Sequence, residues 1–170
     1  MTTVHGDDAD TATPEALPVS GEPYVRRLVP GDRAQWEPLW QGYLTFYESS
    51  LSQRTTDSTF ARLLDDTMGA LVAVDGDGRL VGLVHYVVHP ITWDTRPVCY
   101  LEDLFVDPGQ RGGGVGRALI ASLRDIGRRE GWAEIYWMTA ADNVTARRLY
   151  DRVAQLGNWV RYEMAVTDDG

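Results

Sequence analysis

Short stretches in which hydrophobic residues alternate with polar ones, or form a bounded apolar run, predict the strands of this chain. Two such stretches, ALVAV and RLVGLVHYVV, flank the segment DGDG (75–78), which is a strong signal for a β-hairpin. A third, VCYLEDLFV, indicates a buried strand. The predicted strands cover residues 24–29, 70–74, 79–88, 98–106, 132–139 and 158–166.

Hydrophobic residues at helical spacing predict the helices. Asp32 is the candidate N-cap of the first helix, which is rich in tryptophan and tyrosine. The third has its hydrophobic residues on one face, and Gly131 is the natural residue to end it. The predicted helices cover residues 32–49, 57–69, 115–130 and 142–154, the last capped by Asp142 or Asn143.

The order of these elements is strand, two helices, antiparallel strands, and then strand, helix, strand, helix and strand. This order predicts an α+β fold in which helices flank a mixed, mostly antiparallel central sheet. Residues 23–167 are expected to form one domain, in agreement with a chain length of 170 residues. Residues 1–22 are polar, acidic and proline-containing, so we expect a disordered or loosely attached tail.

Composition narrows the classes of function. The formal charge of -9 argues against a nucleic-acid-binding surface, which should be basic, and is compatible with a cationic small substrate. Cys99 is the only cysteine, which excludes an internal disulfide and favours the reducing cytoplasm. No stretch approaches the ~18 apolar residues of a membrane span, and the chain start lacks the features of a signal peptide. We therefore expect a cytoplasmic protein that binds neither nucleic acid nor a membrane.

Glycines are concentrated in VDPGQRGGGVGRALI (106–120), between a predicted strand and a predicted helix. The free N–H groups of such a loop, at the positive end of a helix dipole, form a site for a phosphate or pyrophosphate. A dinucleotide-binding pattern does not fit, because Gly112-x-Gly114 is followed by Arg117 and lies late in the chain. A P-loop is excluded because the chain contains no lysine. A tight strand–helix turn without a ligand is the remaining alternative.

Three separated segments resemble one protein family. QRGGGVG resembles the Q/R-x-x-G-x-G/A signature of the GNAT superfamily of N-acetyltransferases, with Arg111, Gly114 and Gly116 at the defining positions. YLEDLFVDP resembles the strand that leads into the family's V-x-P shoulder, and DNVTARRLY resembles its N-x-x-A-x-x-x-Y helix. The likeness covers residues 24–166, and YLEDLFV is most similar to the branch that acetylates polyamines.

The resemblance implies a GNAT-like sheet that splays at a binding site for acetyl-CoA. Family members bind the pyrophosphate of coenzyme A with the N–H groups of the glycine loop, and the pantetheine arm lies along the preceding strand. Asn143 would bond to the pantetheine amides. The implied cofactor-binding residues are Phe105, Val106, Arg111, Gly112, Gly113, Gly114, Val115, Gly116, Arg117, Asn143 and Ala146.

Acetyl transfer to an amine needs a base, because an alkyl amine with a pKa near ~10.4 is almost fully protonated at neutral pH. Glu102 is the candidate, since a carboxylate in an apolar strand costs free energy unless it has a partner or a task. In ideal alternation Glu102 shares a face with Leu104 and Val106, and Asp103 points to the other face unless a bulge turns it. A carboxylate paired with an arginine is the competing interpretation. The resemblance assigns the glutamate at this position to the substrate amine.

Tyr150 is the candidate general acid. It falls on one helix face with Asn143 and Ala146, and a phenol can donate a proton to a departing thiolate. The competing interpretation is a tyrosine packed against the sheet. The resemblance assigns the acid role to the tyrosine at this position. A backbone N–H near Val106 would stabilise the oxyanion.

Trp40 and Tyr43 lie on the predicted helix where the family usually builds its acceptor pocket, although a tryptophan-rich helix more often belongs to the core. With Glu102 and Asp103, they are the candidate substrate residues. The hypothesis is an acetyl-CoA-dependent N-acetyltransferase in which a primary amine attacks directly in a ternary complex. The alternative is an acyl-CoA-binding sensor, or a degenerate domain without turnover. No metal site is expected, and a homodimer is compatible with the resemblance.

Overall fold

Five strands form one sheet in the described part of this computed structural model, which comprises residues 23–65 and 68–166. They lie in the order β1-β2-β3-β4-β5, and neighbours are antiparallel except for β4 and β5, which are parallel. The α+β fold with a mixed, mostly antiparallel sheet is therefore confirmed. The strands are β1 (Tyr24–Arg27), β2 (Gly69–Val74), β3 (Leu80–His89), β4 (Val98–Val106) and β5 (Ile135–Tyr136).

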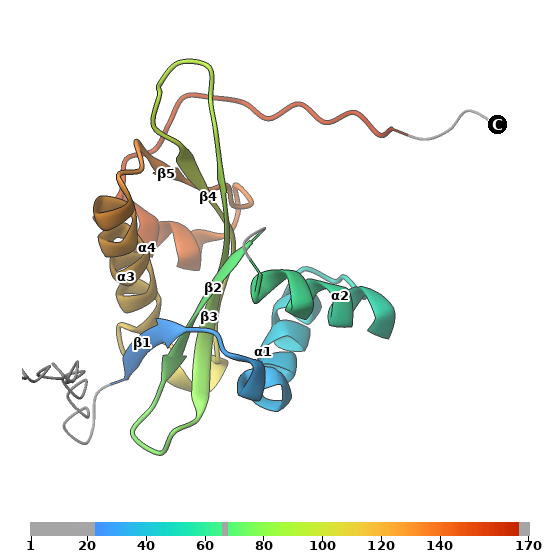
Figure 1. Cartoon of the computed structure of the whole chain (residues 1–170). Coiled ribbons are helices and arrows are strands. Elements are labelled where there is room, and N and C mark those ends of the chain that lie inside the picture. Colours follow the sequence, from blue (N-terminus) through green and yellow to red (C-terminus); the bar gives the residue numbers. More distant parts are fainter. Residues whose placement is uncertain (1–22, 66–67, 167–170) are drawn as a thin grey trace, which may run out of the picture.

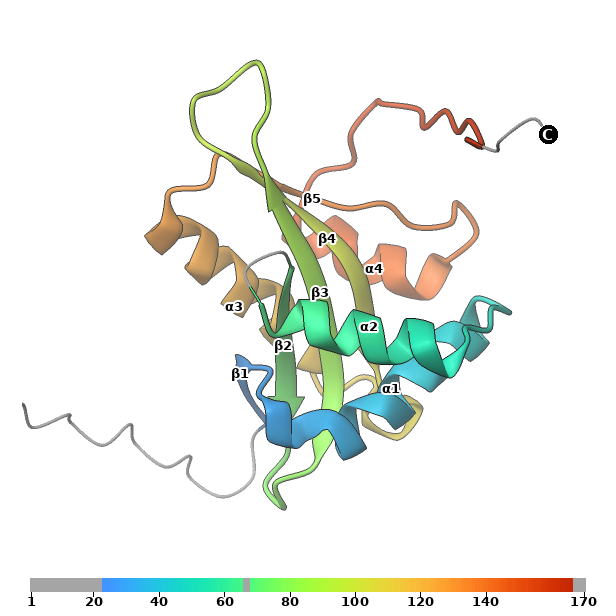
Figure 2. The same cartoon turned by 45° about the vertical axis from the view of Figure 1, so that its right-hand side comes forward.

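Helices cover both faces of this sheet, with α1 and α2 on one side and α3 and α4 on the other (Figures 1 and 2). The third predicted helix has the bounds expected for it, and Gly131 ends it with a left-handed φ of 72°. The expected tail, residues 1–22, lies outside the described residues. The helical elements are η1 (Pro30–Asp32), α1 (Arg33–Phe46), α2 (Gln53–Leu63), η2 (Pro108–Gln110), α3 (Val115–Glu130) and α4 (Val144–Val153).

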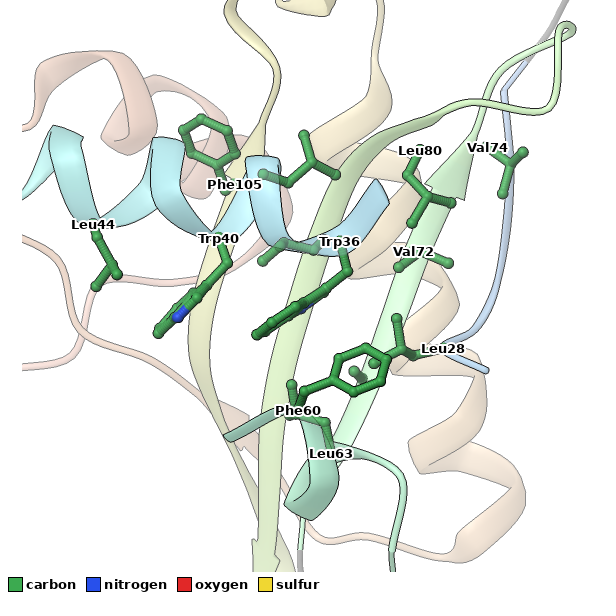
Figure 3. Packing of buried hydrophobic residues seen from close by; sticks show 13 residues of the cluster. Leu28, Trp36, Trp40, Leu44, Phe60, Leu63, Val72, Val74, Leu80 and Phe105 are labelled. Carbon is green, nitrogen blue, oxygen red and sulfur yellow. The ribbon is translucent and has the colours of Figure 1, made fainter. Parts of the chain in front are cut away.

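The core on the α1 side of the sheet is aromatic. The rings of Trp36 and Trp40 stack with their centroids 5.9 Å apart, and Phe60 of α2 packs on Trp36. Figure 3 shows both indoles reaching from α1 over the strands. Both tryptophans are buried, so the expectation that Trp40 contacts substrate is wrong. Its helical spacing from Trp36 places it on the face of α1 that packs on the sheet.

The core on the opposite side is aliphatic and rests on α3. Val115, Leu119, Leu123 and Ile126 are all buried, and they pack in one cluster with Leu101 of β4. Complete burial of such a side chain contributes about 1.5–3 kcal/mol. The amphipathic pattern of this helix is thus sufficient to hold its N-terminus against the end of β4.

Two helix starts differ from their predictions. The second helix begins at Gln53 and not at residue 57, because the Ser52 hydroxyl accepts a hydrogen bond from the N–H of Thr55 and caps it. Asp32 does not cap α1 with its side chain. Its carboxylate instead accepts two hydrogen bonds from the guanidinium of Arg26, at 2.6 and 2.8 Å. A charged partner within reach therefore replaces the local capping bond.

The strand predicted over 132–139 is reduced to β5. It pairs with β4 only where Cys99 faces Ile135 and Tyr100 faces Tyr136. Beyond these pairs the two segments diverge, so among the described residues one edge of β4 from Leu101 to Val106 has no strand beside it. This is the splay that the fold class predicts.

The segment 158–166, predicted as a closing strand, is not a strand in the structure. It runs away from the body of the molecule (Figure 1). Trp159, Tyr162 and Met164 are 84%, 91% and 90% exposed. The pattern is that of a strand, but a strand needs a neighbour to satisfy its backbone, and this segment has none among residues 23–65 and 68–166. We call residues 158–166 the C-terminal arm.

Candidate active site

A groove of about 560 Å³ lies between the end of β4, the glycine loop, α1 and α4. It gathers most of the residues predicted to bind a cofactor, although they come from separate parts of the sequence. Tyr43 and Tyr150 line it as well, whereas Glu102, Asp103 and Trp40 do not. Gly113 lies in the loop between two lining glycines. The predicted cofactor residues that line the groove are Phe105, Val106, Arg111, Gly112, Gly114, Val115, Gly116, Arg117, Asn143 and Ala146.

The glycine loop presents unbonded backbone donors to the groove. Gly112 and Gly114 both have a φ of 85°, and a Cβ atom on either would meet nothing within 4 Å. The helix α3 starts at Gly114 without a side-chain cap, and the N–H of Ala118 is bonded to the carbonyl of Gly114. The N–H groups of Val115 and Gly116 precede that bond and have no partner inside the helix. The loop and helix end thus form an anion site.

The open edge of β4 adds main-chain groups of alternating direction. The N–H of Asp107 bonds to the carbonyl of Val81 in β3, so Phe105, two residues earlier, also turns its N–H and carbonyl toward β3. Leu104 and Val106 turn theirs to the open side. The expectation that the backbone of Phe105 pairs with the cofactor therefore shifts by one residue, to Leu104, while Val106 keeps its place.

A β-bulge interrupts β4 next to the groove. Asp103 pairs with His85, while Leu101 pairs with the next residue of β3, so Glu102 has no partner residue on that strand. Leu101 and Leu104 both pack in the core on the α3 side, which leaves Glu102 and Asp103 on the opposite side between them. The expectation that Glu102 shares a face with Leu104 is therefore wrong. The bulge brings the two carboxylates to one face.

The two carboxylates have different surroundings. Glu102 reaches solvent, yet lost hydration raises its pKa, and the negative charge of Asp103 raises it further, while the positive charge of Arg62 acts in the opposite direction. Asp103 is bonded to His85, and its negative charge also acts on the hydroxyl of Tyr43, whose pKa it raises. A carboxylate with a raised pKa that can still exchange protons with water has the properties of a general base.

Two of the tyrosines that line the groove, Tyr43 and Tyr150, have raised pKa values. Burial raises the pKa of Tyr150 to about 12, and its ring lies edge-on to Trp137. Burial also raises the pKa of Tyr43, and the charge of Asp103 adds to this effect. Both phenols therefore stay protonated at neutral pH and remain hydrogen donors.

Of the two residues predicted to cap the last helix, Asn143 is the N-cap of α4. Its Oδ1 atom accepts from the N–H of Ala146 at 3.2 Å, and its Nδ2 atom donates to the hydroxyl of Thr139 at 3.1 Å. The cap holds the start of α4 against the groove. These contacts leave the second hydrogen of Nδ2 and the second lone pair of Oδ1 unused, and a bond to pantetheine would use these two groups.

His85 is a site residue that sequence reasoning missed. It is completely buried, accepts from the indole N–H of Trp36 at 2.9 Å, and contacts Asp103 at 3.0 Å. The sequence offered one signal for it: His85 is a polar residue in β3, a strand that is otherwise largely apolar. Its partner could not be read from the sequence because the bulge changes the register between β3 and β4.

Other chemistries find no support in residues 23–65 and 68–166. No cluster of histidine, cysteine or acidic side chains there could hold a metal ion, and no helix there is long and apolar enough to cross a membrane. Burial raises the pKa of the Cys99 thiol to about 12, so this cysteine is not a thiolate nucleophile at neutral pH.

The sequence model of the acetyltransferase (GNAT) family matches residues 36–154, which span α1, the glycine loop and α4. The chain belongs to the GNAT family. This assigns the protein as an N-acetyltransferase, and GNAT enzymes generally use acetyl-CoA. The matched region contains the groove and both carboxylates, so the family assignment and the site geometry concern the same residues.

Curated relatives of this GNAT acetyltransferase are similar over most of its length. It is 33% identical over 142 residues to the D-amino-acid N-acetyltransferase HPA3 of Saccharomyces cerevisiae, covering 82% of this chain and 88% of that protein. It is 34% identical over 122 residues to the aminoglycoside N(6')-acetyltransferase type 1 of Stenotrophomonas maltophilia, covering 66% of this chain and 74% of that protein.

Solved structures support the same fold. The ribosomal-protein-alanine N-acetyltransferase of Brucella melitensis biovar Abortus 2308 superposes with a TM-score of 0.70 at 25% identity, covering 85% of this chain and 100% of the other. AAC(6')-Iy, solved with a bisubstrate analogue containing coenzyme A, gives a TM-score of 0.75 at 19% identity, covering 86% of this chain and 99% of the other. At that identity the second comparison bears on the fold alone.

Proposed function

We propose that this GNAT enzyme transfers the acetyl group of acetyl-CoA to a primary amine by direct attack in a ternary complex. The observation that carries the proposal is the groove itself. One part of it is an anion site of backbone N–H groups, and another is Tyr43, on whose hydroxyl the negative charge of Asp103 acts. A nucleotide thioester and a cationic amine require these two kinds of environment side by side.

The residues present fit the shape and chemistry of acetyl-CoA, which supplies the acyl thioester when bound. The positive φ and open space at Gly112 and Gly114 allow a diphosphate to approach the N–H groups at the start of α3. Leu104 and Val106 offer donors and acceptors along the open edge of β4 to the pantetheine amides. Arg111 and Arg117 add positive charge at the same wall.

In the proposed mechanism, Glu102 accepts one proton from the substrate ammonium, which frees a nitrogen lone pair to attack the thioester carbonyl carbon. The carbon–sulfur bond then breaks, and Tyr150 donates its hydroxyl proton to the departing sulfur. Tyr150 recovers a proton from the new amide nitrogen, and Glu102 releases its own proton to solvent. A backbone N–H near Val106 stabilises the carbonyl oxygen as it gains negative charge.

The acceptor is proposed to be a small cationic amine. Glu102 and Asp103 lie on one face at the acceptor end, with Tyr43 beside them. The formal charge of -9 favours the approach of cations in general. Two relatives carry names that point to amine acceptors, D-amino acids in one case and aminoglycosides in the other.

The test is turnover of acetyl-CoA, followed by release of free thiol, across a panel of polyamines, lysine, D-amino acids and aminoglycosides. We expect thiol release that depends on at least one amine. Thiol release without amine dependence would contradict the transferase proposal. Binding of coenzyme A in a calorimeter without any turnover would instead support the alternative, a sensor or a degenerate domain.

A cytoplasmic homodimer is the proposed assembly. Two features support it: the edge strand β5 has no further strand beside it in the described residues, and the C-terminal arm is apolar and exposed. If the arm of one copy lay beside β5 of another copy, the edge of β5 would gain a neighbouring strand and the apolar side chains of the arm would be covered. Analytical ultracentrifugation should give a dimer for the chain, and a monomer for a Trp159→Ser, Tyr162→Ser variant. A monomeric unmodified chain would contradict the proposal.

A further inference from the structure

A chain of hydrogen bonds leads from the core to the acceptor end of the groove. The indole N–H of Trp36 donates to Nε2 of His85 over 2.9 Å, and Nδ1 of His85 lies 3.0 Å from Oδ2 of Asp103. The hydroxyl of Tyr43 lies close enough to the same carboxylate for the negative charge of Asp103 to raise the pKa of Tyr43. The imidazole is fully buried beside the rings of Trp36 and Trp40, at centroid distances of 5.8 and 5.2 Å. Figure 3 shows how α1 places these two indoles over the strands.

The hydrogen on the imidazole can be assigned from its partners. An indole nitrogen only donates, so Nε2 of His85 is the acceptor and carries no hydrogen. Nδ1 therefore carries it and donates to Asp103, and the imidazole is neutral in this arrangement. If Nε2 carried a hydrogen as well, it would face the indole N–H of Trp36. Two buried donors would then oppose each other, and the hydrogen bond to Trp36 would be lost.

Asp103 thus has a negative charge that its neighbours do not neutralise. These are the neutral His85 and Tyr43, and in the described residues no arginine forms an ion pair with it. Glu102 next to it adds a second acidic group, and Arg62 of α2 is the cation whose charge acts on Glu102. The side chain of Asp103 keeps 12% of its surface exposed. A carboxylate bonded on its inner side and open on its outer side is suited to bind a cation.

We propose that Asp103 binds the ammonium group of the acceptor, and that His85 is the residue that positions this carboxylate. This inference rests on the proposed amine acetylation and divides the labour between the two acidic residues. Asp103 holds the cation, while Glu102 in the bulge takes up and releases the proton. Two carboxylates with such different surroundings commonly carry such separate roles. Trp36 prevents the imidazole ring from turning over.

The first test measures the binding of n-butylammonium chloride by NMR titration of the full chain saturated with coenzyme A. No acetyl group is present, so binding is read without turnover. Asp103→Asn keeps the shape and removes the charge, and we expect it to weaken binding at least about tenfold, in the range of lost charge-assisted bonds. Unchanged binding, or failure of the unmodified chain to bind, would overturn the inference.

Two amide substitutions of His85 form a matched pair. His85→Asn places an amide near Nδ1 and can still donate to Asp103, whereas His85→Gln places it near Nε2 and retains only the contact to Trp36. We expect near-normal ammonium binding for His85→Asn and weakened binding for His85→Gln. Equal losses in both would indicate a packing role only. Thermal melting of each variant identifies losses that come from unfolding.

A double-mutant cycle tests whether His85 acts through Asp103. The combined Asp103→Asn, His85→Gln variant should bind the ammonium no more weakly than Asp103→Asn alone, because the positioned charge is already gone. Additive losses would contradict the positioning role. Where a His85 variant does not fold, the ¹⁵N shifts of the unmodified imidazole decide the matter: hydrogen on Nδ1 supports the inference and hydrogen on Nε2 overturns it.

The outcomes separate this inference from the proposed function. Absent turnover with all amines, together with ammonium binding that depends on Asp103, would refute the acetyl transfer and keep the cation site. Normal amine turnover with a KM that Asp103→Asn leaves unchanged would refute the cation site and keep the transfer. We expect Asp103→Asn to raise KM by a larger factor than it lowers kcat.

Discussion

The ring of Tyr150 meets the ring of Trp137 edge-on, with their centroids 5.3 Å apart. This contact fixes the ring of Tyr150 on α4, and Tyr150 lines the groove. A phenylalanine at this position would keep the ring contact and remove only the hydroxyl. The contact therefore permits a clean test of the general acid.

Tyr150→Phe should lower kcat by about 100-fold, the usual contribution of a positioned acid, because the departing sulfur loses its proton donor. The affinity for coenzyme A should change by less than about twofold, since the backbone groups that bind it are untouched. Steady-state kinetics and calorimetry give the two numbers. Tyr47→Phe, a change of a neighbouring groove tyrosine, is the control, and an unaltered kcat in Tyr150→Phe would remove this residue as the acid.

Glu102→Gln should shift the pH dependence of kcat/KM upward. The raised pKa of Glu102 means that the base becomes available only above that pKa, so activity of the unmodified enzyme should rise with pH through it. Without the base, the rate depends on amine that is already neutral, and activity at pH 7 should fall by about 100-fold. A pH–rate profile of both enzymes checks this. Glu130→Gln at the end of α3 is the control, and an unmoved profile for Glu102→Gln would count against the base.

Gly114→Ala should weaken coenzyme A binding by about tenfold and cost about 1–2 kcal/mol of stability, because an alanine is strained at positive φ. The strain would be relieved by moving the N–H groups that begin α3. Calorimetry and thermal melting measure the two effects. Gly31→Ala is the matched control, since it has open space and no positive φ. Full affinity in a strained Gly114→Ala variant would argue against the loop as the anion site.

Asp32→Asn should destabilise the fold by about 1–3 kcal/mol at pH 7, because it removes the anion bonded to Arg26. The guanidinium lowers the pKa of Asp32 in the folded chain, so the stabilisation is complete above the unfolded pKa of about 3.9. It is lost as the pH falls from there through the lowered folded pKa. Urea unfolding at pH 7 and at low pH should therefore give a difference between the two proteins that shrinks with acid. A constant difference would contradict the ion pair as its cause.

Local sequence patterns correctly predict the elements whose ends are marked by particular residues, such as a glycine after a helix. The strand 98–106 and the helix 115–130 have the predicted bounds, and Gly131 ends that helix in the left-handed conformation for which glycine is favoured. The glycine loop between them lies on the groove, as its composition indicates. In these cases the relevant interactions span only a few residues of chain.

The misplaced features depend on interactions between distant parts of the chain. Trp36 and His85 are 49 residues apart, and the bulge at Glu102 exists only relative to the pairing of β3 with β4. Strict alternation therefore predicts the wrong face for Glu102, although a bulge is the feature expected to turn its neighbour Asp103. The arm has the alternation of a strand, but the part of the chain that the structure describes offers it no strand to pair with.

The splayed end of the sheet has a consequence for how this enzyme can evolve. The polar groups that Leu104, Val106 and the start of α3 present to the groove are main-chain atoms, which no ordinary substitution deletes. The acceptor site that we propose depends instead on individual side chains such as Glu102, Asp103 and Tyr43, each of which a single codon change can replace. Acceptor preference can thus diverge among descendants of such a protein while their common donor is retained.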